Sequence, residues 1–514
     1  MIVKTSLYVV FLSSALLFSC QKTGRAPNTP PDTLVVALES GPTYLDPRYA
    51  TDAYSERISR LIFNGLLRPD ENSRLEADLA AKWQSIDDRT YVFRLRPGVF
   101  FHDGRPLTAA DVKFTYDSVL EAKNRSPRRG KLGFLEAVDQ LGSHEVRFRL
   151  KAPFAPFLEE LTLGIVPAGT LGYGQRLIGS GPFSLAEFSP GERVVLNANP
   201  SYWDGPPGLS TIVFKVIPDA IVRVLEFRKG SVDFIQNYFE PDMLPWLAKN
   251  TGAAILSEQG TIFQYIGMNL EHPILARREV RQALGYAIDR EAIIRHILKD
   301  LAIPATGLLS PRHWAYEPAV AQLSYAPETA KRMLDTAGFP DPDGDGPLPR
   351  FKLSYKTTNL DLRKRVAETI KEQLARVGIE LEVRAYEWGT FYGDVKSGNF
   401  HLYSLEWVGV LDPDIYYNLF HSESVPPNGN NRGRYRNPAL DALLEQGRSA
   451  AAIEERRRVY SRVQKILADD LPYVPLWWWK NVVVMKANVR GFVPYPDGDL
   501  ISLRKVSLSA ATGN

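Results

Sequence analysis

The sequence predicts an α/β fold with more than one domain. Short apolar segments of strand length alternate with amphipathic helices along the chain, which is typical of that class. The 514 residues exceed the length that one hydrophobic core usually supports, so two or three domains are expected. A composition of 44% hydrophobic and 24% charged residues is that of a folded chain. No period typical of a solenoid or propeller occurs.

The first element is an apolar run over residues 7–18, preceded by Lys4. It is shorter than the ~20 residues that cross a bilayer, and it has the length of a signal-peptide core. Residues 1–19 are therefore expected to be a signal peptide. The run closes with Leu-Phe-Ser before Cys20, the only cysteine, and this resembles a lipobox. We expect cleavage before Cys20 and a diacylglycerol anchor on it; the alternative is a plain signal peptide with a chance cysteine.

The next elements lead from the tether into the folded chain. Residues 20–32 are polar, contain a glycine and three prolines, and are expected to form a tether. A buried strand is expected at 33–38, and alternation predicts another over 91–96. A helix should follow, because Thr108 is a good N-cap and Asp111 completes a capping box with it.

Later helices are predicted from apolar residues three and four positions apart. One begins near residue 279, and its apolar stripe is continued by Ile293, Ile294 and Ile297. Another covers 362–377, ends at a C-cap glycine, Gly378, and leads into a strand at 379–383. A last helix is expected over 453–468.

Several function classes find no support in the sequence. The net charge of +3 gives no basic stripe for nucleic acid, and one cysteine excludes an intramolecular disulfide and a multi-thiolate metal site. Zinc-protease, nucleophile-elbow and P-loop motifs are missing, and no two of the seven histidines are three or four residues apart. Residues 341–346 imitate a calcium loop, but Lys352 stands where a bidentate glutamate is required, so a polar turn is expected. No cofactor and no metal site are expected.

Several segments of the sequence resemble those of a known protein family. Phe101–Val112 resembles the signature of bacterial extracellular solute-binding proteins of family 5, the peptide- and nickel-binding receptors of ABC importers. Further segments resemble landmarks of that family in the usual order, and together they cover nearly all of residues 33–506. They are Gly179–Phe183, Asn199–Trp203, Gly230–Asp233, Glu279–Arg290, Ala337–Pro340, Tyr435–Asp441 and Asp470–Leu476.

The resemblance implies a two-lobed periplasmic binding protein of type II with an extra domain inserted in lobe I. The ligand would be enclosed between the lobes, and closure about a hinge would signal that ligand is bound. The implied ranges are 33–75, 178–268 and 482–507 for lobe I, 76–177 for the extra domain, 269–481 for lobe II and 508–514 for a tail.

The resemblance also implies a set of ligand-binding residues. In dipeptide-binding members a threonine after the first strand lines the pocket, and Thr51 falls there. A basic residue receives the ligand carboxylate, and Lys356, followed by Thr357, is the nearest match. The two ligand-side tryptophans of the family match Trp388 and Trp407, the second followed by Val408 and Gly409. Core packing of the tryptophans and a solvated strand end for Lys356 are the alternatives.

The chain departs from the family at Val410. In the peptide receptors an aspartate three residues after the second tryptophan pairs with the ligand α-ammonium, and valine cannot do so. Asp412 is close by, but Asp412-Pro413 is also typical of an N-cap followed by proline at the first helical position, with a helix over 415–420. We therefore expect di- and tripeptides with a free amine to bind poorly, and ligands with a blocked or absent amine, or longer ones whose terminus lies elsewhere, to be preferred.

The function implied is a lipid-anchored, non-enzymatic subunit that captures a peptide or peptide-like solute and delivers it to a membrane permease. Expected partners are this ligand, the permease and ATPase subunits, and the membrane through Cys20, with no nucleic acid; a monomer in the periplasm or cell envelope is expected. A nickel or metal-chelate receptor is the alternative within the family. A secreted hydrolase is disfavoured, and a sensor or chaperone partner on the same fold stays open.

Overall fold

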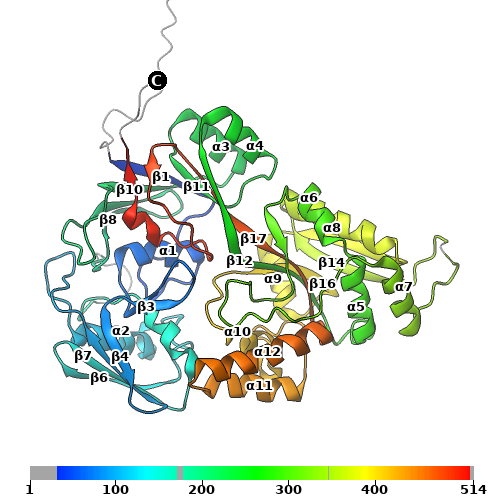
Figure 1. The fold of residues 1–514 in the computed structure, drawn as a ribbon, viewed down its shortest axis with the longest axis horizontal. Coiled ribbons are helices and arrows are strands. Elements are labelled where there is room, and N and C mark those ends of the chain that lie inside the picture. The colour runs from blue at the N-terminus through cyan, green and yellow to red at the C-terminus, as the bar shows by residue number, and fades with distance from the viewer. Residues whose placement is uncertain (1–31, 171–176, 345, 510–514) are drawn as a thin grey trace, which may run out of the picture.

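The computed structural model describes residues 32–170, 177–344 and 346–509. The expected signal peptide, Cys20 and most of the tether lie outside these residues. No helix in the described part of the chain is both long and apolar enough to cross a membrane. Two α/β lobes lie side by side and are joined by two long strands, β12 and β17, with a smaller β-rich unit attached to the first lobe (Figure 1).

One sheet runs through both lobes. Its order is β15-β14-β16-β12-β17-β11-β1-β10-β9-β8, and β13 (Ala302–Pro304) pairs with β17. In lobe I the strands are β1 (Thr33–Leu38), β8 (Phe183–Ser189), β9 (Arg193–Ala198), β10 (Thr211–Val216) and β11 (Phe234–Gln236). In lobe II they are β14 (Phe351–Thr358), β15 (Ile379–Tyr386) and β16 (Leu402–Trp407). The shared strands are β12 (Ala254–Met268) and β17 (Tyr473–Met485).

Lobe I is built around β1, which is parallel to both β10 and β11. Helix α1 (Ala53–Ile62) begins at Asp52, whose carboxylate accepts a hydrogen bond from Ser55 N at 2.8 Å, and it packs Ile58 against one face of the sheet. Helices α3 (Ala220–Lys229) and α4 (Met243–Thr251) cover the other face. The smaller elements are η4 (Ile501–Lys505) and the hairpin of β18 (Val489–Arg490) and β19 (Ser507–Leu508).

The extra domain has its own antiparallel sheet, in the order β4-β5-β7-β6, and its own aromatic core around Phe93, Phe148 and Phe157. The predicted capping box is confirmed, because Asp111 Oδ2 accepts hydrogen bonds from the backbone N and the hydroxyl of Thr108. The elements are β2 (Leu67–Pro69), β3 (Leu75–Ala77), β4 (Ala80–Ser85), β5 (Thr90–Leu95), β6 (Leu135–Gly142), β7 (Glu145–Leu150), α2 (Ala109–Leu120), η1 (Ala122–Asn124) and η2 (Ala155–Thr162).

Lobe II has a core on each face of its sheet, because successive residues of β12 point to opposite sides. Ile266 packs with one set of helices, and Tyr265 packs with the other. The first set is α5 (Arg278–Ala287), α6 (Arg290–His296), α7 (Pro327–Thr336) and α8 (Asp361–Ala375). The second is α9 (Trp388–Ser397), α10 (Ile415–Phe420), η3 (Ser422–Ser424), α11 (Pro438–Ser449) and α12 (Ile453–Asp470).

The long apolar stripe that starts near residue 279 belongs to two helices rather than one. Asp289 interrupts it by acting as the N-cap of α6, where its carboxylate accepts a hydrogen bond from Ala292 N at 2.9 Å. The expected helices at 362–377 and 453–468 correspond to α8 and α12, and Gly378 follows α8 with a φ of 80°. At 341–344 the chain makes a polar turn, with Asp341 accepting hydrogen bonds from the backbone of Asp343 and Gly344, and residue 345 lies outside the described residues.

The strands that join the lobes, where the hinge is expected, contain a break in the β12–β17 ladder. Residues 254–259 pair with β17 next to β11 in lobe I, residues 263–267 pair with it in lobe II, and the register shifts between them. At Gly260 an added Cβ would lie 2.5 Å from the carbonyl oxygen of Trp479, so only glycine allows this approach. The expected divisions at residues 268 and 481 fall at the end of β12 and inside β17, and they stay a prediction.

Candidate functional site

A polar cavity of about 150 Å³ lies where lobe I, the extra domain and lobe II meet. Residues from all three line it, among them Ala50, Glu159 and Gly409. A larger cavity of about 710 Å³ lies between the extra domain and helices α10 and α11 of lobe II. Lys131 and Glu160 line both cavities, so the two adjoin. A ligand held here would touch lobe I, the extra domain and lobe II.

Two of the predicted site segments meet at the smaller cavity. Ala50 lines it from lobe I and precedes the exposed Thr51, while Gly409 lines it from lobe II and follows Trp407 and Val408. Segments more than 350 positions apart in the sequence are therefore neighbours at one cavity. The direct contact of Thr51 with a ligand stays a prediction.

The two predicted tryptophans belong to one stack of side chains. Trp388 lies on Tyr392 with ring centroids 5.1 Å apart and an interplanar angle of 10°. The guanidinium carbon of Arg432 lies 5.3 Å from the Tyr392 centroid and 5.0 Å from that of Trp407. Trp407 in turn is nearly parallel to Tyr265, at 6.5 Å. The stack joins α9, the end of β16 and β12, and Trp388 keeps 56% of its surface exposed.

Lys356 is buried and already has a carboxylate partner. Its ammonium lies 2.7 Å from Asp394 Oδ2 and 5.3 Å from the centroid of the Tyr386 ring, and Thr357 beside it is also buried. The hydrogen bonds from Lys356 and Asn399 hold the pKa of Asp394 below its usual range. A ligand carboxylate would have to compete with Asp394, and the role of Lys356 as its receptor stays a prediction.

The segment after Trp407 turns its side chains to different sides. Val408 is 39% exposed, whereas Val410 is 5% exposed and packs in the lobe II core. Asp412 is buried and accepts hydrogen bonds from both terminal nitrogens of Arg456, one of them at 2.7 Å. It also accepts one from Asp414 N at 2.8 Å. The expected N-cap role of Asp412 was wrong by two residues, because the N-cap of α10 is Asp414. The carboxylate of Asp412 is nonetheless fully engaged, by Arg456 and by the backbone of Asp414.

The smaller cavity holds charged groups of both signs. Arg60 pairs with Asp499, and Arg128 pairs with Glu56 at 2.6 Å. The Glu159 carboxylate forms no hydrogen bond or ion pair within the described ranges. Burial raises the pKa of Glu159 well above its ordinary value, and the nearby charges of Asp412 and Glu160 raise it further, while Arg456 opposes the shift.

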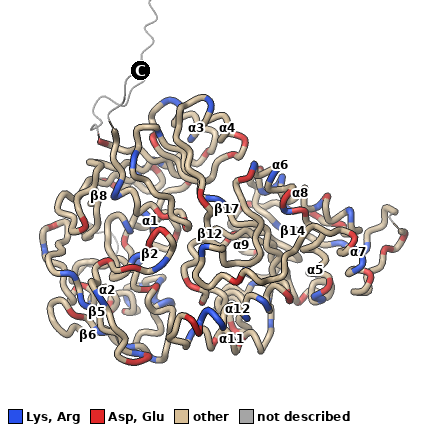
Figure 2. Tube along the Cα trace, in the orientation of Figure 1, with Lys and Arg blue, Asp and Glu red and all other residues tan. Residues whose placement is uncertain are grey.

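The pKa of Glu160 is raised in the same way. Burial is the main cause, and the positive charges of Lys131 and Arg128 oppose it. Both carboxyl groups therefore keep their protons to a higher pH than an exposed glutamate does. In Figure 2 basic and acidic residues are interspersed along the backbone trace of both lobes.

Near the hinge, the two lobes also approach each other through charged side chains. Arg363 of α8 pairs with Glu406 of β16, and Glu406 accepts a hydrogen bond from the indole nitrogen of Trp479 at 2.6 Å. Across the gap, Arg365 of α8 lies 3.1 Å from Glu240 of lobe I. The exposed Arg365–Glu240 pair is the one of these that crosses between the lobes, and it contributes little stability by itself.

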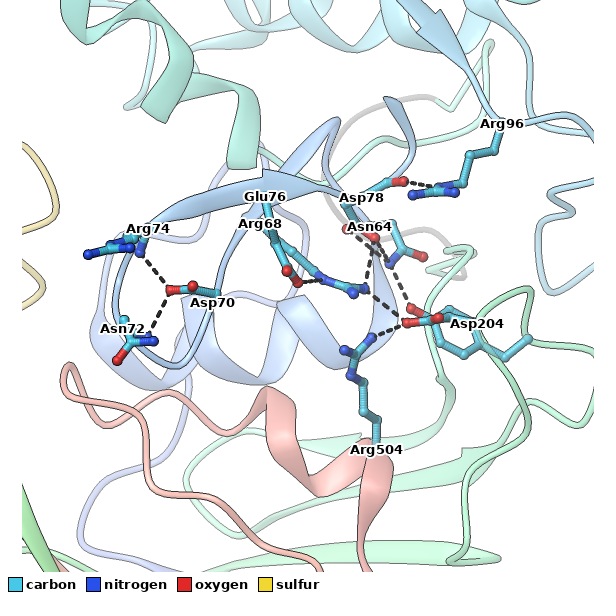
Figure 3. A network of polar contacts seen from close by, with 11 residues as sticks. Asn64, Arg68, Asp70, Asn72, Arg74, Glu76, Asp78, Arg96, Asp204 and Arg504 are labelled. Atoms are coloured by element: carbon cyan, nitrogen blue, oxygen red, sulfur yellow. Dashed lines mark hydrogen bonds and ion pairs between the residues drawn. The ribbon is translucent and has the colours of Figure 1, made fainter. Parts of the chain in front are cut away.

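Lobe I and the extra domain are joined by the network in Figure 3. Asn64 donates hydrogen bonds to both carboxylate oxygens of Asp78 at 3.1 Å, and Arg68 bridges Asp78 and Asp204, which also pairs with Arg504. Burial raises the pKa of Asp78 to about 6, against the opposing effect of Arg68. The network holds the extra domain against lobe I and does not contact the smaller cavity.

The sequence did not reveal Glu159, which lines the smaller cavity, or Arg432, which belongs to the aromatic stack. Arg432 lies only a few positions before a segment that resembles a family landmark, and Glu159 lies in a short 3₁₀ helix without apolar periodicity. Nothing in the local pattern distinguishes them from surface residues. In the described residues, no group of three or more His, Cys, Asp or Glu side chains is arranged to hold a metal ion.

Comparison with known proteins gives consistent matches over most of the chain. The family model of the bacterial extracellular solute-binding proteins, family 5 (middle part), matches residues 74–427. The oligopeptide-binding protein AppA of Bacillus subtilis is 31% identical over 511 residues, which are 95% of this chain and 93% of that protein. The dipeptide-binding protein of Escherichia coli is 26% identical over 500 residues, 91% of this chain and 93% of that protein.

Solved structures match just as widely. The oligopeptide-binding protein AppA from Bacillus subtilis in complex with a nonapeptide aligns with a TM-score of 0.79 and 30% identity, over 93% of this chain and 99% of that chain. NikZ from Campylobacter jejuni in complex with Ni(L-His) aligns with a TM-score of 0.80 and 27% identity, over 93% of this chain and all of that chain.

Proposed function

The chain belongs to family 5 of the bacterial extracellular solute-binding proteins, and we propose that it is the substrate-binding subunit of an ABC importer. The observation that carries this proposal is the cavity at the meeting point of both lobes and the extra domain. Because the parts of the sheet in the two lobes are joined through β12 and β17, ligand held in that cavity would stabilise a closed form relative to an open one. Binding becomes a change of shape that a permease can recognise.

The proposed ligand is a peptide or peptide-like solute. A ligand that leaves the smaller cavity past Lys131 and Glu160 enters the space of about 710 Å³ next to α10 and α11, which is ample for further residues. The relative AppA, solved with a nonapeptide, supports a ligand longer than a dipeptide. The NikZ complex with Ni(L-His) keeps a metal chelate as the alternative to be tested.

The proposal includes an anchor and partners. Cys20 would carry the diacylglycerol, and residues 20–32 would let the body of the protein reach the permease at the cell envelope. The importer would further comprise permease and ATPase subunits. We propose no catalytic step, and we propose that the protein works as a monomer.

The experiment is a thermal-shift and calorimetry screen of the purified chain against peptides of two to nine residues, nickel–histidine and small organic solutes. Binding one to one should raise the melting temperature, because ligand at 100 times Kd stabilises the folded state by about 2.7 kcal/mol. Recovery of unaltered ligand after incubation is expected. Absence of any shift would remove support for an importer subunit, and a product that accumulates with time would replace it with an enzyme.

A further inference from the structure

Carboxylates from two parts of the protein approach each other where lobe II meets the extra domain. Glu159 lies in η2 of the extra domain, while Asp412 and Asp414 lie in the segment that leads into α10 of lobe II. Glu159 and Leu411 line the same cavity, and Leu411 is followed directly by Asp412. The negative charges of Asp412 and Asp414 therefore act on Glu159 across this boundary.

Arg448 of α11 joins the two parts at the same boundary. Its guanidinium carbon lies 5.2 Å from the ring centroid of Phe154, the residue that precedes η2, and its Nε lies 3.0 Å from Asp414 Oδ1. Helix α11 and η2 are thus packed together in this structure. Separation of the lobes would break this contact and would move Glu159 away from Asp412.

The cations at the smaller cavity and at this boundary are matched with carboxylates other than that of Glu159. The pairs are Arg456–Asp412, Arg448–Asp414, Arg60–Asp499, Arg128–Glu56 and, through electrostatic attraction, Lys131–Glu160. Arg456 also attracts Glu159, but both of its terminal nitrogens are bound to Asp412. Within the described ranges, Glu159 is therefore the carboxylate of this set that has no cation of its own.

A carboxylate in this position favours its protonated form while the lobes are together. Contact with lobe II removes water from Glu159 and places Asp412 near it, and both changes disfavour ionisation. The pKa of Glu159 is accordingly raised well above its ordinary value, by burial most and then by Asp412 and Glu160. Once lobe II has moved away, water reaches Glu159 and Asp412 no longer acts on it, so its pKa falls back toward that of an exposed glutamate.

The neighbouring carboxylates are surrounded differently. The charges that act on Glu160 belong to the extra domain and to lobe I, and they are Lys131, Arg128 and Glu56. The charges that act on Asp414 all belong to its own lobe, and they are Arg448, Asp412 and Arg456. For both groups these charges stay in place when the lobes separate. Glu159 is the one of the three whose charged neighbours come from the opposite side of the boundary.

We infer that Glu159 takes up a proton when the extra domain and lobe II close on a ligand, so that capture of the ligand is coupled to pH. This inference rests on the proposed function and names a regulation of its site. The proton is exchanged with solvent through the cavity that Glu159 lines, where part of its surface stays exposed. The carboxylate gains a proton on closing and returns it on opening, so acid favours capture and a higher pH favours release.

The test uses N-acetyl-tetra-alanine amide, a peptide without a titrating group, in calorimetry from about pH 4.5 to about pH 8.5. The affinity of the wild type should fall as the pH rises from the open-form pKa of about 4.5 to the closed-form value, by up to about tenfold per pH unit, because one proton is bound with each ligand. Buffers of different ionisation enthalpy measure that proton directly. In Glu159→Gln, which cannot titrate, both the fall and the proton uptake should be absent.

The matched control is Glu160→Gln, which removes the adjacent carboxylate from the same helix and the same cavity. Whatever it does to the affinity itself, this variant should keep most of the pH dependence of the wild type, because the charges that act on Glu160 do not belong to lobe II. The inference is overturned if the wild type takes up no proton in this range. It is also overturned if Glu159→Gln keeps the pH dependence of the wild type.

A failure of the peptide to bind would count against the proposed function, and closure is then measured without ligand. Ile86 of the extra domain and Ile453 of lobe II are 57% and 54% exposed, so cysteines at these positions can carry spin labels in Cys20→Ser, which has no other thiol. The distance between the labels should lengthen as the pH rises when residue 159 is glutamate and stay constant in Glu159→Gln. A distance that responds to pH equally in both chains, or in neither, would contradict the role of Glu159 independently of any ligand.

Discussion

Arg456 holds the carboxylate of Asp412 from both of its oxygens, in an ion pair that is buried at the base of α10. The carboxylate two residues after Val410 is therefore already neutralised. The pair also fixes the loop that carries Gly409 and Leu411 into the cavity. Its effects on ligand choice and on stability can be separated experimentally.

We first predict that free-amine peptides bind no better than their N-acetylated counterparts. Val410 cannot pair with an ammonium, Asp412 is occupied, and burial favours the neutral form of Glu159 and Glu160. An ammonium enclosed without a partner costs several kcal/mol. Calorimetry with matched peptides at neutral pH measures the difference.

The matched variant is Val408→Asp, because Val408 is exposed whereas Val410 lies in the core, where an aspartate would unfold the lobe. Val408→Asp should gain affinity for the free amine only. The prediction fails if the wild type prefers the free amine strongly, or if the folded variant gains nothing for it.

Breaking the Asp412–Arg456 pair should be costly. Arg456→Met leaves a buried carboxylate without its partner, and we expect a loss of about 3–5 kcal/mol in the free energy of unfolding. Urea denaturation measures this loss. The exposed neighbour Arg457, which pairs with Glu454 on the same helix, provides the control, since Arg457→Gln should cost about 0.5 kcal/mol or less. Equal losses in the two variants would contradict the pairing.

The pH dependence of stability should change in Glu159→Gln. The pKa of Glu159 is raised on folding, so its contribution to stability is fully present below the unfolded pKa of about 4.5 and is lost as the pH rises through the folded value. Glutamine does not titrate, so the variant should gain melting temperature relative to wild type as the pH rises from 4 and level off above the folded pKa. A difference in melting temperature between Glu159→Gln and wild type that stays the same at every pH would be evidence against this.

Membrane association should depend on Cys20. Cys20→Ser should release the protein from the membrane fraction or leave it unprocessed, because a thioether-linked lipid requires the thiol. Fractionation and the intact mass of the mature N-terminus measure the effect. Cys20 is the only cysteine, so no other thiol confuses the result. A plain signal peptide would be favoured if Cys20→Ser fractionated as the wild type does and the wild-type N-terminus carried no acyl mass.

The parts of the structure that the sequence predicted are those fixed by local chemistry. The capping box at Thr108 and the alternation at 91–96 each depend on residues a few positions apart, and the structure confirms them. The expected C-cap at Gly378 was wrong by two residues, because the C-cap of α8 is Arg376. The break at Asp289 was missed because apolar residues continue on both sides of it. Here a side-chain hydrogen bond decides the boundary rather than the hydrophobic period.

The candidate site likewise contains residues that local sequence predicted and residues that it did not. Trp388 and Trp407 stand out as residue types in short segments, and the structure places both in one stack. The Nε of Arg432 lacks an acceptor because of how distant segments are placed around it. The pKa of Glu159 is raised in part because Asp412 approaches it from another domain. Both are properties of the assembled chain, so no local pattern contains them.

The order of strands in lobe I has a consequence for how the protein is made. The central strand β1 lies between residues 211–216 and 234–235, and β11 finds its second neighbour only in β17, near residue 485. A ribosome must therefore synthesise most of the polypeptide before this sheet can close. Non-local pairing of this kind delays folding until the late segments are present. An exported chain benefits from that delay, since translocation favours a polypeptide that has not yet folded.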